Sequence, residues 1–383
     1  MFRQMPVLLL ALIALISLAQ PYVPLVVQAQ LLAVSLFLKN VIVFILPFII
    51  FSLLFKAMAQ MASQASRMVA LLLLSICLSN FLSTLTSYTV GHFGYQLDLC
   101  AVFPDETLLL VPSWQLDLPK WIANDHALFS GLILGLTLGR YTPKMALRIS
   151  SVLDIALQFC LKTLLYIIPL FLLGFVLKMN YEGVMGYIAS HYGPIFILIT
   201  ASVFTYICLI YLIASQFKPS ISLTWIKNML PAALAGFSSM SSAAAMPLTL
   251  LATEKNAKHP ALSQSVIPAT VNVHLIGDCF AIPVFAFAVL KTFGVEEPSF
   301  STYLLFASYF VLAKFSVAAV PGGGILVMIP ILESFLGFNT PMTSLITALY
   351  ILFDPVITCA NVLGNGAFAL IFDKFFGKSL QRP

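Results

Sequence analysis

Charged residues are scarce in this sequence of 383 residues, because Asp, Glu, Lys and Arg together make up only 9% of it. A soluble domain of this size carries about a quarter charged residues, so the composition excludes a water-exposed surface for most of the chain. Hydrophobic residues reach 61% and the mean hydropathy is +1.02. Apolar runs near the ~20 residues that cross a bilayer core recur throughout. The sequence therefore predicts an integral, all-α membrane protein.

Metal-binding and disulfide patterns are also missing. The six cysteines stand singly with no CxxC pair, and the five histidines include no HExxH motif. We therefore expect no metal site, no disulfide framework and no organic cofactor. The formal net charge of +5 comes from basic residues scattered at segment ends, which argues against a nucleic-acid partner. Nothing arranges Ser, His and Asp as a triad, so we do not expect an enzyme.

The apolar runs predict eight membrane-spanning helices and two interrupted stretches. We expect the helices near residues 5–20, 31–56, 68–95, 126–140, 147–178, 190–216, 262–292 and 340–372. The first could be mistaken for a secretory signal, but no small-x-small cleavage site follows it, so we favour a retained helix. Small residues and proline interrupt the stretches 223–257 and 301–337 near their middles.

Charge placement suggests how the interrupted stretches lie. With a cytoplasmic N-terminus, basic residues collect inside and acidic residues outside, provided that each stretch enters and leaves on one side. If both stretches crossed fully, Lys255 and Lys258 would lie outside. The charges favour two re-entrant hairpins, the first from the cytoplasm and the second from outside, with both termini cytoplasmic. The alternative is a pair of kinked helices with small packing residues.

The hairpin tips are rich in Ser, Gly and Pro, at 236–247 and 318–324. Irregular backbone at membrane depth survives only where protein or a water-filled cavity supplies hydrogen-bond partners. Broken segments at matching places in two halves point to a transporter's binding site. Each tip is followed by a long predicted helix, 262–292 or 340–372, so the halves match as an inverted repeat.

The last predicted helix carries a polar face of Asp354, Thr358, Asn361 and Asn365, spaced four, three and four residues apart. A carboxylate at the bilayer centre costs ~2.5–3.5 kcal/mol, so Asp354 is expected to face protein. Pro355 removes a helix hydrogen bond and frees a carbonyl nearby. A carboxylate beside free carbonyls suits a cation or a solute's ammonium group. The alternative is a polar stripe that joins helices.

Three further polar residues stand in apolar surroundings. His274 and Asp278 are four apart in the predicted helix 262–292, which places them on one helix face. Imidazole titrates near neutral pH, so this pair is a candidate proton carrier, and a satisfied buried histidine is the alternative. Lys314 lies well inside the first arm of the second hairpin, where we expect its ammonium to approach Asp354 or Asp278. Snorkelling is the alternative.

This layout resembles the dicarboxylate/amino acid:cation symporters, the family of glutamate and neutral amino-acid transporters. The serine-rich segment 238–247, Val320-Pro-Gly-Gly-Gly324 and Asn361-Val-Leu-Gly-Asn365 carry the resemblance. It implies an elevator-type homotrimer, with scaffold mainly in 1–222, the third helix (68–95) in the transport unit, and the transport core in 223–383. It also implies that Asp354 receives a solute's amine and Asn361 its carboxylate. The substrate-binding residues expected are Asp354, Asn361, Thr358, Ser239, Ser241, Ser242, Val320, Pro321 and Gly322.

Departures from the family pattern concern cation coupling. Where the family has oxygen ligands for sodium, this sequence has Ile276, Asn365 and Lys314. The third-helix hydroxyls Ser83 and Thr84 remain, but they are a weak site by themselves. Sodium coupling is therefore expected to be lost, with H⁺ as the candidate coupling ion. The residues assigned to coupling are His274, Asp278, Lys314, Asn365, Ser83 and Thr84.

The resemblance also bears on the solute. The family's arginine for an acidic side chain is absent, because Ile357 and Met240 stand at its two places. We therefore expect a secondary active transporter of a neutral amino acid or similar zwitterion in a bacterial inner membrane. Two alternatives remain, a proton-coupled carrier of dicarboxylates or acidic amino acids that uses Lys314, and an uncoupled channel or sensor. The sequence does not identify the solute.

Overall fold

A computed structural model describes residues 15–16, 18–63, 67–97, 110–116, 118–119, 122, 124–317 and 322–380. The residues described contain α-helices and short 3-10 helices but no β-strand. The chain divides into two compact units. Unit 1 comprises Met1–Pro6, Ser66–Ala101 and Pro194–Pro383, and unit 2 comprises Val7–Ala65 and Val102–Gly193.

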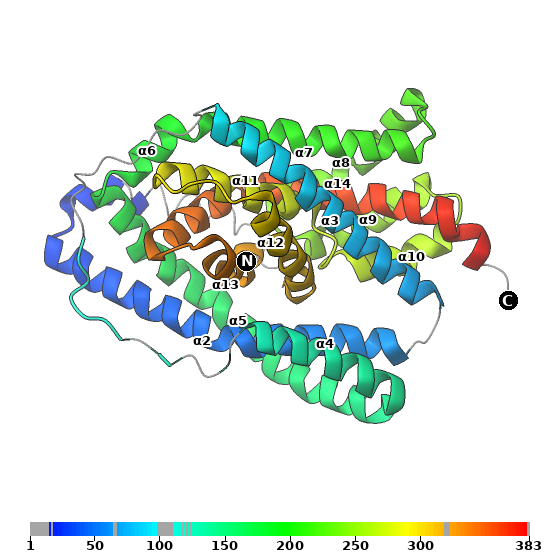
Figure 1. Ribbon diagram of the computed structural model, residues 1–383, viewed down its shortest axis with the longest axis horizontal. Helices are drawn as coiled ribbons and strands as arrows, with labels where there is room; N and C mark the ends of the chain where they lie inside the picture. The colour runs from blue at the N-terminus through cyan, green and yellow to red at the C-terminus, as the bar shows by residue number, and fades with distance from the viewer. Residues whose placement is uncertain are drawn as a thin grey trace. The chain divides into compact units, whose positions relative to one another are not determined.

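Among the residues described, unit 2 is built mainly on three α-helices and a shorter fourth one. They are α2 (Leu25–Ser63), α4 (Asn124–Tyr141), α5 (Pro143–Tyr181) and α6 (Val184–His191). Helix α2 lies alongside α4 and α5 (Figure 1). Ser35 of α2 donates to the Leu170 carbonyl (3.2 Å) and accepts from the Gly174 amide (3.1 Å), which joins α2 directly to α5.

Unit 1 holds the remaining helices, and α14 is packed against most of them. The helices are α3 (Arg67–Gln96), α7 (Gly193–Ala214), α8 (Pro219–Ser239), α9 (Ser242–Asn256), α10 (Pro260–Thr270), α11 (Ile276–Thr292), α12 (Phe300–Ala313), α13 (Gly323–Leu336) and α14 (Thr340–Leu380). Helix α14 contacts α8, α9, α10, α11 and α13, while α3 crosses α11 and α12 (Figure 1). Buried apolar side chains such as Tyr211, Phe280 and Leu363 form the core between these helices.

Each interrupted stretch forms two helices that pack against each other. In the first, α8 ends at Ser239 and is followed by Met240, whose backbone is left-handed (φ 49°), and Ser241 caps α9 by accepting the Ala244 amide (3.3 Å). In the second, α12 continues into a 3-10 turn at Lys314–Ser316 before α13 begins at Gly323. Residues 318–321, which include the predicted site residues Val320 and Pro321, lie outside the described part of the chain.

The prediction of one continuous helix over 262–292 is wrong. Helix α10 ends at Thr270 and α11 starts at Ile276, so residues 271–275 are not helical. The buried Asn80 of α3 supplies the hydrogen bonds that this break needs. Its Nδ2 donates to the Val273 carbonyl (2.7 Å) and its Oδ1 accepts from the Leu275 amide (3.3 Å). Asn80, which is distant in sequence, thus stabilises a non-helical segment where the local sequence pattern predicts a helix.

Two other predicted helices also differ. The stretch 190–216 is divided because Gly193-Pro194 interrupts it, so α6 ends at His191 and α7 starts at Gly193. Most of the first predicted helix, residues 5–14 and 17, lies outside the described residues. The spans 31–56, 68–95, 126–140, 147–178 and 340–372 each fall within a single observed helix.

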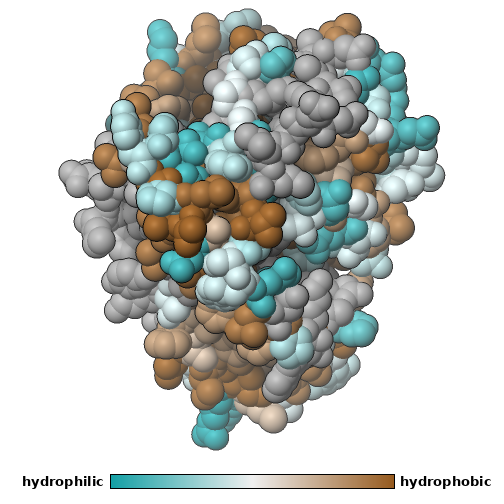
Figure 2. Space-filling model, turned by 90° about the vertical axis from the view of Figure 1, so that its left-hand side faces the viewer, coloured by the Kyte–Doolittle hydropathy of each residue, from teal (hydrophilic) through white to brown (hydrophobic). Residues whose placement is uncertain are grey.

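The described surface suits a lipid environment. Three described helices are long and apolar enough to cross a bilayer, at Ala70–Gln96, Gly193–Ala214 and Thr340–Gly377. Large hydrophobic side chains such as Leu74, Ile197 and Leu234 are more than 60% exposed. Figure 2 shows such residues in brown over much of the coloured surface. Water would make this much apolar exposure unfavourable, whereas hydrocarbon does not.

Candidate functional site

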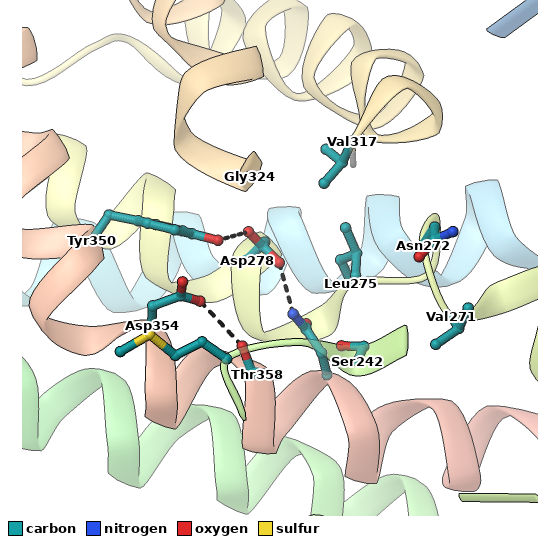
Figure 3. Close-up of a pocket in the computed structure, with 12 residues that line it drawn as sticks. Ser242, Val271, Asn272, Leu275, Asp278, Val317, Gly324, Tyr350, Asp354 and Thr358 are labelled. Carbon is teal, nitrogen blue, oxygen red and sulfur yellow. Dashed lines mark hydrogen bonds between the residues drawn. The ribbon is translucent and has the colours of Figure 1, made fainter. Parts of the chain in front are cut away.

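Three of the four polar residues predicted on the last helix, Asp354, Thr358 and Asn361, line one cavity inside unit 1, whereas Asn365 does not. Asp354, Thr358 and Asn361 project from α14 toward the N-terminus of α11, and Figure 3 shows Asp278 facing them from there. They surround a small cavity of about 30 Å³, which has room for a water molecule or two but not for an amino acid. A larger solute would require the surrounding loops to move. The cavity is lined by Met240, Ser242, Val271, Asn272, Leu275, Asp278, Val317, Gly324, Tyr350, Asp354, Thr358 and Asn361.

Asp354 is buried and bonded to neutral groups. The Thr358 hydroxyl donates to its Oδ1 (3.1 Å), and the Gly322 amide donates to its Oδ2 (3.0 Å). Gly322 has a left-handed backbone (φ 74°), which favours glycine at this start of α13. Among the residues described, no basic side chain forms an ion pair with Asp354. No residue in the described part of the chain therefore supplies a counter-charge to this carboxyl group.

Asp278, in the first turn of α11, has a different environment. Its Oδ1 accepts from the Tyr350 hydroxyl (2.7 Å), and its Oδ2 accepts from Asn361 Nδ2 (2.8 Å) (Figure 3). The Lys314 Nζ lies 3.4 Å from Asp278 Oδ1. The helix N-terminus also favours a negative charge at this position. Asp278 is therefore both hydrogen-bonded and charge-compensated.

Lys314 is fully buried, at 0% exposure, so it does not snorkel. Its ammonium pairs with Asp278 and lies 4.6 Å from the centre of the Phe310 ring, a distance that allows a cation–π contact. The expected approach to one of the two acids is therefore observed, with Asp278 as the partner. Lys314 does not line the cavity beside Asp354.

Gly324 lets α13 approach this ion pair closely. A Cβ at this position would overlap both Asp278 Oδ1 and the Tyr350 hydroxyl. The start of α13 thus packs directly on the hydrogen bond between the Tyr350 hydroxyl and Asp278 Oδ1. Any larger residue at 324 would have to displace one of them.

Asn361 connects the two sides of the site. Its Oδ1 accepts from the Gly277 amide (2.8 Å), while its Nδ2 donates to Asp278. One hydrogen of the Nδ2 group has no partner among the described residues, so it could donate to a solute without breaking either bond. The role that resemblance gives Asn361, binding a solute's carboxylate, is compatible with these contacts and stays a prediction.

The predicted pairing of His274 with Asp278 is wrong. His274 precedes the first residue of α11, so the two side chains do not share a helix face. Its Nε2 lies 2.8 Å from Ser79 Oγ, and its Nδ1 lies 3.1 Å from Asn365 Oδ1. The Phe368 ring covers the imidazole, with ring centroids 4.3 Å apart. His274 and Asn365 therefore form a second buried polar group.

The hydroxyl residues assigned from the sequence mostly bond to their own helices. Ser83 and Thr84 are buried in α3 and donate to the carbonyls of Ser79 and Asn80, each at 2.8 Å. Ser239 donates to the Ala235 carbonyl (2.6 Å). Ser241 caps α9, and the buried Ser242 lines the cavity.

Sequence reasoning missed Tyr350, Ser79 and Asn80. Tyr350 precedes Asp354 by four residues and so shares its helix face, a spacing that could have indicated it. Ser79 and Asn80 contact the break at 271–275 from a helix almost 200 residues away in sequence. No local pattern could have pointed to that contact.

Comparison with known proteins identifies the family of the chain. Residues 126–375 match the sodium:dicarboxylate symporter family, and the chain belongs to that family. It is thus a multi-pass membrane protein of a transporter family and not a member of an enzyme family.

A more specific similarity involves part of the chain. Over 159 residues it is 25% identical to a protein of Caenorhabditis elegans named as a sodium-dependent excitatory amino acid transporter, glt-4. The match covers 41% of this chain and 32% of that relative's length.

Proposed function

We propose that this protein is a secondary active transporter that carries a neutral amino acid or similar zwitterion across a membrane. The observation that supports this most is the contrast between two buried acids. Asp278 is compensated by Lys314, whereas Asp354 lines the cavity with no basic partner among the described residues. A buried carboxylate in that condition favours a positively charged ligand group.

In this proposal, Asp354 and Thr358 receive the solute's ammonium group. Asn361 and the first-tip backbone at Ser239, Ser241 and Ser242 receive its carboxylate. Support comes from the free hydrogen of Asn361 Nδ2 and from the N-terminus of α9, whose dipole favours an anion. The loop that contains Val320, Pro321 and Gly322 acts as the gate, since the Gly322 amide already bonds to Asp354.

Coupling in this proposal does not use sodium. The Lys314 ammonium beside Asp278 takes the place of a bound cation. Ile276 belongs to the apolar core and Asn365 bonds to His274, so two places where the family resemblance expects sodium ligands offer no carboxylate. His274 and Asp278 are the proposed proton carriers. His274 is the stronger candidate, because Asp278 already has a cationic partner.

The proposed architecture has eight transmembrane helices and two re-entrant hairpins related as an inverted repeat. The proposed transporter is an elevator-type homotrimer in a bacterial inner membrane, with both termini cytoplasmic. The grouping of α3 with residues 194–383 in unit 1 supports placing the third helix in the moving transport unit. The core 223–383 lies in the same unit.

A proton-coupled carrier of dicarboxylates is the second candidate. It needs Lys314 to bind the second carboxylate, but the Lys314 ammonium pairs with Asp278 and does not line the cavity. The neutral-solute proposal is therefore favoured. An uncoupled channel or sensor would share the same site but would not concentrate a solute.

Uptake into proteoliposomes tests these proposals. We expect radiolabelled alanine or serine to accumulate against its gradient under an inward proton gradient, equally well with sodium or potassium outside. Excess succinate should not compete. Dependence on a sodium gradient together with indifference to pH would refute the coupling proposal, and equilibration without accumulation would identify a channel.

A further inference from the structure

A second cavity lies in unit 1, among residues that the solute site does not use. Its volume is about 190 Å³, and it lies where α7 ends, α8 begins and the last turns of α14 pass. It is lined by Ala214, Ser215, Gln216, Lys218, Ile221, Trp225, Asn256, Lys258, Leu370, Asp373 and Lys374. The cavity shares no residue with the cavity beside Asp354.

The lining of this cavity is positively charged. Lys218, Lys258 and Lys374 all contribute to it, and among the described residues none of the three forms an ion pair. Lys374 makes one hydrogen bond, to the Ile213 carbonyl (3.1 Å), which leaves two of its hydrogens. Three basic side chains that line one cavity attract an anion toward it.

Asp373 is the one acidic residue in the lining, and both of its carboxylate oxygens already have hydrogen-bond partners. Asp373 Oδ1 lies 2.6 Å from His259 Nδ1, and its Oδ2 accepts the Lys258 (2.8 Å) and His259 (3.3 Å) amides. These bonds cap the start of α10 and draw the carboxylate toward it. Among the residues described, Asp373 forms no ion pair with any of the three lysines, and these lysines outnumber the one acid.

The surroundings indicate the boundary between membrane and water. The apolar helix α7 ends at Ala214, and the apolar part of α14 reaches Gly377, so two candidate spans finish beside the cavity. Trp225 lines it, and the neighbouring Phe217 is 70% exposed. Aromatic and basic residues gather at this depth of a bilayer, where lipid phosphates lie.

We propose that this lysine-lined cavity binds a phosphate group, supplied by the headgroup of an anionic lipid. Its volume is several times that of the cavity beside Asp354, so it accommodates a phosphate group together with bridging waters. The start of α8 at Pro219 has no side-chain cap, so the positive end of that helix dipole adds to the lysines. An inorganic phosphate ion has the same chemistry and is the other source to distinguish.

Chemical protection tests the site on the unmodified, detergent-purified protein. We expect dioctanoyl phosphatidylglycerol to slow acetylation of Lys218, Lys258 and Lys374, read by peptide mass spectrometry. Lys227 and Lys255, which lie outside the cavity, should react as before. Phosphate-free dioctanoylglycerol should protect nothing. Equal protection by inorganic phosphate alone would assign the site to the free ion instead of the lipid.

Paired variants test the same site through affinity. Lys218→Gln/Lys374→Gln should raise the dissociation constant for dioctanoyl phosphatidylglycerol about thirtyfold, because each lysine near a lipid phosphate contributes roughly fivefold. The matched Lys227→Gln/Lys255→Gln variant should leave it unchanged. If both pairs lowered affinity equally, or if neither phosphate compound protected the cavity lysines more than Lys227 and Lys255, the proposal would be wrong. Should the first variant not fold, the protection experiment decides.

Discussion

At the scale of single residues, two buried carboxylates lie in one small region and differ in what surrounds them. Asp278 accepts from Tyr350 and Asn361 and pairs with Lys314. Asp354 accepts from a hydroxyl and an amide, both neutral. A buried carboxylate without a counter-ion is suited to a positively charged ligand group, whereas one with a counter-ion is less so. The two environments therefore support different proposed roles for the two aspartates.

Asp354→Asn should abolish concentrative uptake. The substitution keeps size and shape but removes the charge that the solute's ammonium would meet. Loss of one charge-assisted hydrogen bond of about 1.5–3 kcal/mol predicts a 10- to 100-fold weaker solute affinity. Isothermal titration of purified protein measures it. Asp154→Asn is the matched control, because Asp154 pairs with Lys56 in unit 2. Wild-type affinity in Asp354→Asn would contradict the assignment.

Lys314→Met should destabilise the protein by about 3–5 kcal/mol, because it leaves the Asp278 charge buried without its partner. Lys314→Met/Asp278→Asn should recover most of that loss, since it removes both charges. Thermal unfolding in detergent compares the three proteins.

A second measurement tests whether a free cation can replace the Lys314 ammonium beside Asp278. In Lys314→Ser, sodium should raise the melting temperature more than choline does, because a small cation can enter beside Asp278. The wild type should show no such difference. If sodium raised the melting temperatures of the variant and the wild type equally, the proposal that the Lys314 ammonium takes the place of a bound cation would be wrong.

At the scale of elements, five of the eight predicted helices agree with the structure because apolar runs bounded by polar residues define them. The break within 262–292 could not be predicted in this way. Val271-Asn-Val-His-Leu275 contains neither glycine nor proline, and its backbone is hydrogen-bonded by Asn80 of α3, which is distant in sequence. Similarly, the approach of Lys314 to an acid follows from the cost of burying charge, whereas the bonds of His274 depend on where α10 stops.

Asn80→Leu should loosen the segment 271–275. The substitution removes the bonds to the Val273 carbonyl and the Leu275 amide, and a buried amide left without a partner costs about 1–3 kcal/mol. We expect faster hydrogen–deuterium exchange at Leu275 and its neighbours. Thr86→Val on the exposed part of α3 is the control. Unchanged exchange would mean that other contacts hold the break.

At the scale of the whole molecule, the chain separates into two units that are not contiguous in sequence. The sequence prediction that the third helix works with the C-terminal half rests on family resemblance, and it stays a prediction about movement. The structure adds that residues 66–101 belong to the same compact unit as residues 194–383. No composition or periodicity distinguishes α3 from its neighbours in this respect, because all of them are apolar.

Site-specific labelling tests whether each helical pair returns to the side it entered. In a variant without the six natural cysteines, we expect Ser299→Cys and Thr340→Cys to react with an impermeant maleimide only from outside. Ser220→Cys and Lys258→Cys should react only from the cytoplasm. These positions flank α12–α13 and α8–α9 and are exposed. Opposite labelling of the two members of either pair would show a full crossing and refute the re-entrant architecture.

The ion pair between Lys314 and Asp278 has a consequence for the energetics of the proposed cycle. An ion taken from solution crosses loaded and is released, so it brings both its concentration gradient and the membrane voltage to bear on transport. The lysine ammonium is covalently attached and makes the return journey as well, so its displacement cancels over each round trip. Neither external salt nor voltage can then do net work through this position. Any accumulation of solute must draw its driving force from a species that leaves the protein.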